Sequence, residues 1–258
     1  MKKRNKKLLI YFIVLIIIAL DYPFIERYID KTFEDYELGV VERVIDGDTL
    51  EVNGSSVRLL GINTPEKNEV YYQEAKDFLS NITQGQLVKL VKGKDDLDLY
   101  GRKLRYVFLE NENINLKLVE QGYANYYFPT SKDRYYNEFK KAWTQCMTNN
   151  INLCERSSDE CASCIELKEF DSVKERIVFV NKCDFSCNLT GWTIKDEGRK
   201  TYTFPNFALE TEVTVKVGTG KNTQDELFWK GEDYVWTKTG DSLFLRDNKH
   251  ELVLFHSY

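Results

Sequence analysis

The chain has 258 residues, of which 42% are hydrophobic and 30% are charged, and its formal net charge is −5 at pH 7. This length suits two modest domains with an additional segment. The acidic balance excludes a broad basic surface, so any affinity for phosphate groups must be local.

The first 25 residues combine a basic start with an apolar run. Lysines and an arginine dominate residues 1–7, and residues 8–20 carry no charge. This run is shorter than the about 20 apolar residues of a full membrane span, but apolar residues resume at 22–25, and small residues suited to signal cleavage are scarce. Since basic residues stay in the cytoplasm, we expect residues 1–25 to anchor an extracytoplasmic protein; secretion after cleavage is the alternative.

A charged spacer at 26–36 is followed by a hairpin whose open end is polar. Two alternating runs flank Asn53-Gly54, a dipeptide that favours a type I′ turn. Oxygen ligands, an arginine and a spare carboxylate suit a hard cation and a phosphate. The alternative is a polar hairpin end with a turn at Asp46-Gly47-Asp48. The polar residues of this hairpin mouth are Asp46, Asp48, Arg58, Asn63, Thr64 and Glu66.

Short strands and helices continue to residue 155. We expect a helix at 69–84, strands at 86–91 and 103–109, and helices at 114–121 and 132–148. Several short strands closed by helices suit a five-stranded OB barrel. The stretch also contains a dense aromatic patch whose exposed members could stack on bases, with core packing as the alternative for each. The patch consists of Tyr123, Tyr126, Tyr127, Phe128, Tyr135 and Tyr136.

A second motif, Asp98-Leu-Tyr-Gly-Arg102, places another arginine at the start of a predicted strand. Together with Ile45-Asp-Gly-Asp-Thr49 and Arg58-Leu-Leu-Gly-Ile-Asn-Thr-Pro-Glu66, it resembles the thermonuclease (staphylococcal nuclease-like) family across residues 37–155. The resemblance implies the OB barrel, a calcium cofactor and endonucleolytic hydrolysis of DNA or RNA. We expect single-stranded or frayed substrates and a monomeric protein.

No histidine can serve this site, because His250 and His256 both lie near the C-terminus. The chemistry must use carboxylates, arginines and a hard cation, and that set suffices for phosphodiester hydrolysis. Carried over residue by residue, the resemblance makes Arg58, Glu66 and Arg102 the catalytic trio. Glu66 would be the base that orients water, and the two arginines would bind the phosphate.

The same resemblance assigns calcium to Asp48, to the residue at position 63 and to the backbone carbonyl of Thr64, and it places Tyr100 against a substrate phosphate. Asn63 departs from the aspartate that many relatives carry there. An amide oxygen can coordinate calcium but adds no charge, and calcium affinity depends on ligand charge. We expect Asp46 to compensate from nearby.

From Cys154 to Val173 the chain is polar and acidic, and we expect a linker at 156–173. Residues 174–258 have β character throughout, which predicts a sandwich. The phrases Asn188-Leu-Thr-Gly-Trp-Thr-Ile194 and Thr239-Gly-Asp-Ser-Leu-Phe-Leu-Arg-Asp247 resemble the lamin-tail domain, an immunoglobulin-like sandwich. This resemblance implies a fold and names no partner. The candidate strands are 176–180, 191–194, 201–204, 212–217, 241–245 and 252–255.

The even number of cysteines favours disulfides in an exported chain. We expect Cys146 and Cys154 to pair across a short loop. Cys161-x2-Cys164 with Cys183-x3-Cys187 also nearly matches a four-cysteine zinc site, but an extracytoplasmic location favours oxidation. The cysteines are Cys146, Cys154, Cys161, Cys164, Cys183 and Cys187.

Three function classes compete. The expected one is a nonspecific endonuclease. The second is a non-catalytic OB module that binds nucleic acid or protein beside an adhesive sandwich. A module that had lost catalysis would be expected to lose Arg58, Glu66 and Arg102, and the chain keeps all three. A redox role for Cys161-x2-Cys164 lacks the surrounding pattern of a thioredoxin-like domain.

Overall fold

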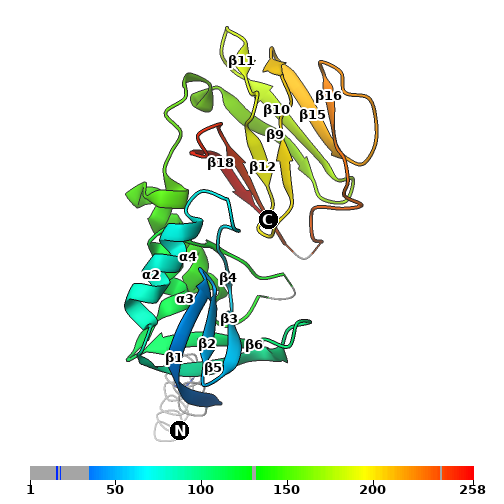
Figure 1. Cartoon of the computed structure of the whole chain (residues 1–258). Coiled ribbons are helices and arrows are strands. Elements are labelled where there is room, and N and C mark those ends of the chain that lie inside the picture. The colour runs from blue at the N-terminus through cyan, green and yellow to red at the C-terminus, as the bar shows by residue number, and fades with distance from the viewer. Residues whose placement is uncertain (1–15, 17, 19–34, 130–131, 239) are drawn as a thin grey trace, which may run out of the picture.

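A computed structural model describes residues 16, 18, 35–129, 132–238 and 240–258. It shows two β-rich domains stacked end to end (Figure 1). The predicted anchor at 1–25 lies outside the described residues apart from Ile16 and Ile18. Among the helices in the described part of the chain, none has the length and apolar character needed to cross a membrane.

The first domain is a closed five-stranded barrel, which confirms the predicted OB fold. Neighbours pair in the order β3-β2-β1-β5-β6, and a parallel pairing of β3 with β6 closes the sheet. Positive φ angles at Asn53 and Gly54 form the predicted tight turn between β2 and β3. Alternating side chains such as Val41, Leu50 and Val107 fill the barrel. The strands are β1 (Tyr36–Asp46), β2 (Thr49–Val52), β3 (Ser55–Leu59), β5 (Leu87–Leu97), β6 (Lys103–Leu109) and the short β7 (Glu112–Asn113).

Three helices pack against this barrel: α2 (Tyr72–Thr83), α3 (Ile114–Glu120) and α4 (Tyr136–Asn149). Two of them begin later than predicted. The start of α2 is delayed by a turn in which Glu69 N donates to Glu66 O. A turn in which Asp133 Oδ1 accepts from Tyr135 N precedes α4. The short strands β4 (Ile62–Asn63) and β8 (Asn125–Tyr126) pair beside the helices.

The second domain is the predicted immunoglobulin-like sandwich. One sheet has the order β16-β15-β10-β9, and the other has the order β13-β12-β17-β18. Large aromatic side chains, including Phe179, Trp192 and Trp229, fill the space between them. The strands are β9 (Ile165–Asp171), β10 (Arg176–Asn181), β11 (Cys187–Asn188), β12 (Thr193–Lys195), β13 (Thr201–Thr203), β14 (Ala208–Leu209), β15 (Glu212–Val217), β16 (Glu226–Trp229), β17 (Ser242–Arg246) and β18 (Leu252–Ser257).

The segment 156–173, predicted as a linker, instead contains a 3-10 helix, η2 (Glu160–Ser163), and the strand β9. β9 pairs with β10 along its length, and Ile165 and Leu167 pack into the sandwich core. Most residues of this strand are charged (Glu166, Lys168, Glu169 and Asp171), which gave it the composition of a linker. The sandwich therefore begins well before residue 174.

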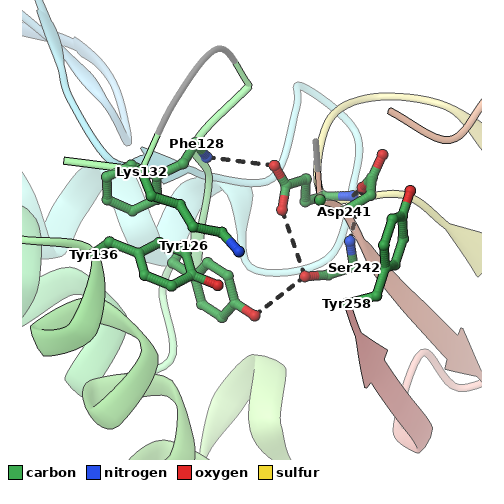
Figure 2. A pocket seen from close by; sticks show the side chains of 9 residues that line it. Tyr126, Phe128, Lys132, Tyr136, Asp241, Ser242 and Tyr258 are labelled. Atoms are coloured by element: carbon green, nitrogen blue, oxygen red, sulfur yellow. Dashed lines mark hydrogen bonds between the residues drawn. The ribbon is translucent and has the colours of Figure 1, made fainter. Parts of the chain in front are cut away.

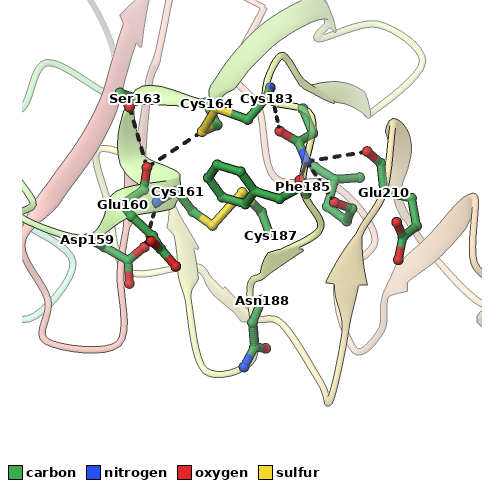
Figure 3. The surroundings of a disulfide bond; sticks show 12 residues. Asp159, Glu160, Cys161, Ser163, Cys164, Cys183, Phe185, Cys187, Asn188 and Glu210 are labelled. Atoms are coloured by element: carbon green, nitrogen blue, oxygen red, sulfur yellow. Dashed lines mark hydrogen bonds between the residues drawn. A yellow bond between two sulfur atoms is a disulfide. The ribbon is translucent and has the colours of Figure 1, made fainter.

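All six cysteines form disulfides, so the zinc alternative is wrong. Cys146 at the end of α4 pairs with Cys154 in η1 (Asn152–Cys154), as predicted. Figure 3 shows how the other two bonds, Cys161–Cys187 and Cys164–Cys183, tie η2 to the segment that follows β10. They join the segment that precedes β9 to the loop that follows β10.

The two domains share one hydrophobic cluster. The ring of Trp143 on α4 lies 5.4 Å from that of Phe244 and 5.7 Å from that of Phe255, both in the sandwich. Arg246 Nη2 donates to Leu153 O at 2.7 Å across the same boundary. Since aromatic packing and hydrogen bonds to charged groups both stabilise, the domains form one body.

Candidate active site

The hairpin mouth is held together by Asp48, which lies in the turn between β1 and β2. Its Oδ2 accepts hydrogen bonds from Thr64 N at 3.2 Å and Thr64 Oγ1 at 3.1 Å. Both residues are buried. The contact draws the turn after β4 against the start of β2, and so it brings the predicted metal ligands together.

Arg58 leaves β3 opposite Thr49 and reaches the same carboxylate. Its Nη2 lies 2.9 Å from Asp48 Oδ2, and its guanidinium donates to Leu59 O at 2.6 Å and Ile62 O at 2.9 Å. The side chain is buried. Because acceptors contact it on several sides, this guanidinium is held in one position.

Arg102 joins the site through Thr49. Its Nη1 donates to Thr49 Oγ1 at 3.3 Å, and Thr49 Oγ1 donates to Asp48 Oδ1 at 3.1 Å. Asp98 accepts from the backbone N of Arg102 at 2.9 Å and from its Nε at 2.6 Å. Burial opposes ionisation of Asp98, but these hydrogen bonds prevail and lower its pKa. Asp98 therefore aims the arginine at the mouth.

Tyr100 lies beside this arginine on an exposed turn. Its side chain is 82% exposed, and its ring centroid is 5.6 Å from Arg102 Cζ. The backbone N of Tyr100 donates to Asp98 Oδ1 at 2.9 Å. An exposed ring against a guanidinium on a fixed turn suits contact with a nucleotide.

Glu66 follows the stiff Thr64-Pro65 turn, and its side chain is 46% exposed at the mouth. Its Oε1 lies 2.7 Å from the Nε of Arg199, a residue of the second domain. Its backbone N donates to Glu69 Oε2 at 2.8 Å. The predicted base is therefore oriented from both domains.

The predicted metal ligands are all oxygen donors, the type that a hard cation prefers, but among them only Asp48 carries a charge. Burial, and then the neighbouring charge of Asp48, raise the pKa of Asp46. A cation beside these two carboxylates would relieve that repulsion. Among the described residues, no group of three or more His, Cys, Asp or Glu side chains is arranged to hold a metal. Asn63 and the carbonyl of Thr64 would have to complete the set.

The aromatic patch belongs mainly to the core. Tyr126 and Tyr135 are buried in the shared cluster, and Tyr136 packs edge-on against Tyr126 and Phe128. The hydroxyls of Tyr126 and Ser242 are 3.2 Å apart across the domain boundary. Core packing, rather than base stacking, explains these residues.

Sequence reasoning missed the contribution of the second domain. Gly198 O accepts from Asn63 Nδ2 at 2.8 Å, and Lys195 Nζ lies 2.8 Å from Glu69 Oε2. Lys195, Gly198 and Arg199 lie at the end of β12 and in the turn that follows it, far along the chain from all three motifs. No local pattern could link this turn to the site, because only the packing of the two domains brings them together.

Comparison with known proteins agrees with this geometry. Residues 56–155 match the sequence model of the staphylococcal nuclease homologue family. A protein named Thermonuclease from Staphylococcus intermedius is 32% identical over 171 residues, which cover 60% of this chain and 100% of that protein. The chain belongs to the staphylococcal nuclease-like family.

Two further relatives support the same activity. The Thermonuclease of Staphylococcus hyicus is 30% identical over 168 residues, covering 59% of this chain and 98% of that protein. An uncharacterized endonuclease of Haemophilus influenzae is 38% identical over 102 residues, covering 37% of this chain and 56% of that protein. The chain described here is therefore a nuclease, and its substrate is nucleic acid. Residues 156–258 match the Lamin Tail Domain.

Proposed function

We propose that the chain is a calcium-dependent endonuclease that hydrolyses single-stranded or frayed DNA or RNA with little sequence preference. The observation that carries this proposal is the connected series of contacts from Arg102 through Thr49 and Asp48 to Arg58. It links the two guanidiniums through Asp48 and Thr49: Arg58 pairs with the Asp48 carboxylate directly, and Arg102 reaches it through the Thr49 hydroxyl. Glu66 is exposed at the same mouth. Two fixed cations beside an accessible carboxylate suit attack of water on a phosphodiester.

In the proposed reaction, Arg58 and Arg102 bind the phosphate and offset the charge that gathers on it in the transition state. Glu66 orients the attacking water and takes its proton. Tyr100 contacts a neighbouring part of the nucleotide. The positions of both arginines are set before substrate arrives, because Asp98 and the backbone acceptors around Arg58 hold them.

Asp48, Asn63 and the carbonyl of Thr64 would hold the calcium ion. When bound, calcium supplies Lewis-acid polarisation of a phosphoryl oxygen. Since Asn63 is neutral, we expect weak binding that needs the calcium levels at which extracellular modules work.

Digestion assays test this function. The purified chain, incubated with single-stranded DNA, duplex DNA and RNA, should cleave single strands fastest with calcium and lose activity when chelator is added. Absence of calcium-stimulated cleavage of every substrate would favour the alternative, a non-catalytic nucleic-acid- or protein-binding module.

We further propose that the nuclease acts outside the cytoplasm, held at the membrane by residues 1–25. Three disulfides support this placement, because cytosolic thiols are kept reduced. A nonspecific nuclease outside the cytoplasm also spares the nucleic acid of its own cell. Protease added to intact cells should digest the chain, and full protection would contradict the placement.

A further inference from the structure

The turn between β12 and β13, residues 196–200, lies against the hairpin mouth. Its backbone accepts two hydrogen bonds from the first domain: Asn63 Nδ2 donates to Gly198 O at 2.8 Å, and Asn125 Nδ2 donates to Glu197 O at 2.9 Å. The Glu197 side chain accepts from the backbone N of Phe128 at 3.4 Å and from the hydroxyl of Ser242 at 3.5 Å; Phe128 and Ser242 are labelled in Figure 2. The turn is therefore bonded to both strands of the β4–β8 pair.

This turn is a fixed part of the fold. Asp196 and Lys200 close the turn with two hydrogen bonds, Lys200 N to Asp196 Oδ1 at 2.8 Å and Asp196 N to Lys200 O at 3.1 Å. Glu197 N donates to Asp241 Oδ1 at 3.2 Å. Asp196, Glu197 and Gly198 are buried. Displacing the turn would break these hydrogen bonds to both domains, so it does not behave as a movable lid.

Arg199 is the exposed member of this buried turn. Its side chain is 61% exposed, and its Nε contacts Glu66 Oε1. Since the contact runs through Nε, the guanidinium can also present N–H groups to a bound strand. Glu66 itself remains 46% exposed, so the pair borders the mouth without sealing it.

The net negative charge of the chain makes an exposed arginine beside the active site important for binding phosphate. With a net charge of −5, the chain has no broad basic field and must bind phosphates through individual cations. We propose that Arg199 is a substrate-binding residue of the nuclease, supplied by the lamin-tail domain, and that it contacts a backbone phosphate next to the one held by Arg58 and Arg102. The proposal rests on the active site proposed above, since Glu66 places Arg199 there.

Kinetics of the full chain test this role. Arg199→Ala should raise KM for a single-stranded oligonucleotide by about fivefold and leave kcat within about twofold, because one phosphate contact is lost. The slope of log KM against log salt should become shallower by about 0.7, the value for one phosphate contact on a single strand. Arg199→Lys should keep most of the slope, because it keeps the charge.

Arg176→Ala is the matched control, since Arg176 on β10 pairs with Glu169 within the sandwich. Its KM and salt slope should equal those of the wild type. Anisotropy of a labelled oligonucleotide, measured with chelator present, gives the same salt slope for binding without turnover. This readout separates the two proposals, because an inactive wild type would contradict the nuclease assignment while the binding slope still tested Arg199.

A wild-type KM and salt slope in Arg199→Ala would overturn the inference. A higher kcat or a lower KM in that variant would also overturn it, and would show that Arg199 restrains Glu66.

Discussion

At the scale of single residues, Asn63 shows why this chain departs from the aspartate of many relatives. Its Oδ1 lies 3.4 Å from Arg58 Nη2, and its Nδ2 donates to Gly198 O. An aspartate would keep the first contact and lose the second, because a carboxylate has no proton to donate. The Asn63 amide thus contacts Arg58 in the hairpin mouth and also forms a hydrogen bond across the domain boundary.

Asn63→Asp should therefore have two opposite effects. The added charge should lower the calcium concentration that gives half-maximal activity. The lost hydrogen bond to Gly198 should lower the free energy of unfolding by about 1 kcal/mol. Calcium titration of activity and thermal denaturation in chelator measure the two effects.

Asn125→Asp is the control for this pair of measurements. Asn125 is the cross-strand partner of Asn63 and makes the same kind of bond, to Glu197 O, but it is not one of the predicted calcium ligands. It should lose stability and keep the wild-type response to calcium. An unchanged calcium response in Asn63→Asp would remove position 63 from the metal site, or show that Asp46 already supplies the charge.

Glu66→Gln should lower turnover by about 10²- to 10⁴-fold with little change in KM, because an amide cannot take a proton from water. The fold should survive, since the lost ion pair with Arg199 is exposed and such pairs contribute at most about 1 kcal/mol. Steady-state kinetics and circular dichroism test both statements. Glu51→Gln, which breaks an exposed pair with Arg43 on the barrel, should keep full turnover. Near-wild-type turnover in folded Glu66→Gln would exclude Glu66 as the base.

Much of this site could be predicted from sequence because its members lie on adjacent elements. The tight turn at Asn53-Gly54 fixes the register of β2 and β3, which sets Arg58 opposite Thr49. Arg199 could not be predicted, because its place depends on how two separately patterned domains pack.

At the scale of elements, the sequence predicts strands well where apolar residues alternate with polar residues that are not all of one charge. The predicted bounds of β6 and β15 agree with the structure. β9 was missed because its outward positions, Glu166 and Lys168, are charged. In addition, two disulfides rather than a long apolar face secure the segment before it. Covalent bonds between distant cysteines carry no local signal in composition.

The disulfide between Cys146 and Cys154 gives an element-scale prediction. It closes a short loop, with a sequence separation of 8. Replacing both cysteines with alanine should lower the free energy of unfolding by about 2 to 3 kcal/mol, because the unfolded chain regains the entropy of that loop. Thermal denaturation measures the loss. Reduction of the wild type should cost more, since it opens all three disulfides, and an unchanged Tm in the double variant would contradict the prediction.

At the scale of the whole molecule, the domain boundary buries acidic groups as well as aromatic rings. Burial, and then the charge of Asp241, raise the pKa of Glu197 to about 8 and that of Asp196 to about 7. The pKa of Asp241 is also raised by burial. Glu197 and Asp241 line a small cavity at this boundary together with Lys132 and Tyr258 (Figure 2). We therefore expect the stability of the packed domains to depend on pH.

The sign follows from the protonation of Glu197. Its pKa in the folded chain lies above its ordinary value of 4.5, so the folded state holds this proton more firmly than the unfolded state does. The stability that Glu197 contributes is complete below about pH 4.5 and is lost as the pH rises through about 8. Asp196 acts in the same sense over a lower range, so the wild type should lose stability steadily from pH 5 to pH 9.

Glu197→Gln isolates this effect, because glutamine keeps an acceptor for Phe128 N and a polar group near Ser242 but cannot ionise. Its Tm should match that of the wild type near pH 5 and exceed it at pH 9 by roughly 2 to 4 °C, which corresponds to about 1 kcal/mol in a chain of this size. Calorimetry at several pH values measures the difference. A difference in Tm that stays constant with pH would show that Glu197 keeps the same charge in the folded and unfolded chain, and the pH dependence would then have to come from Asp196 and Asp241.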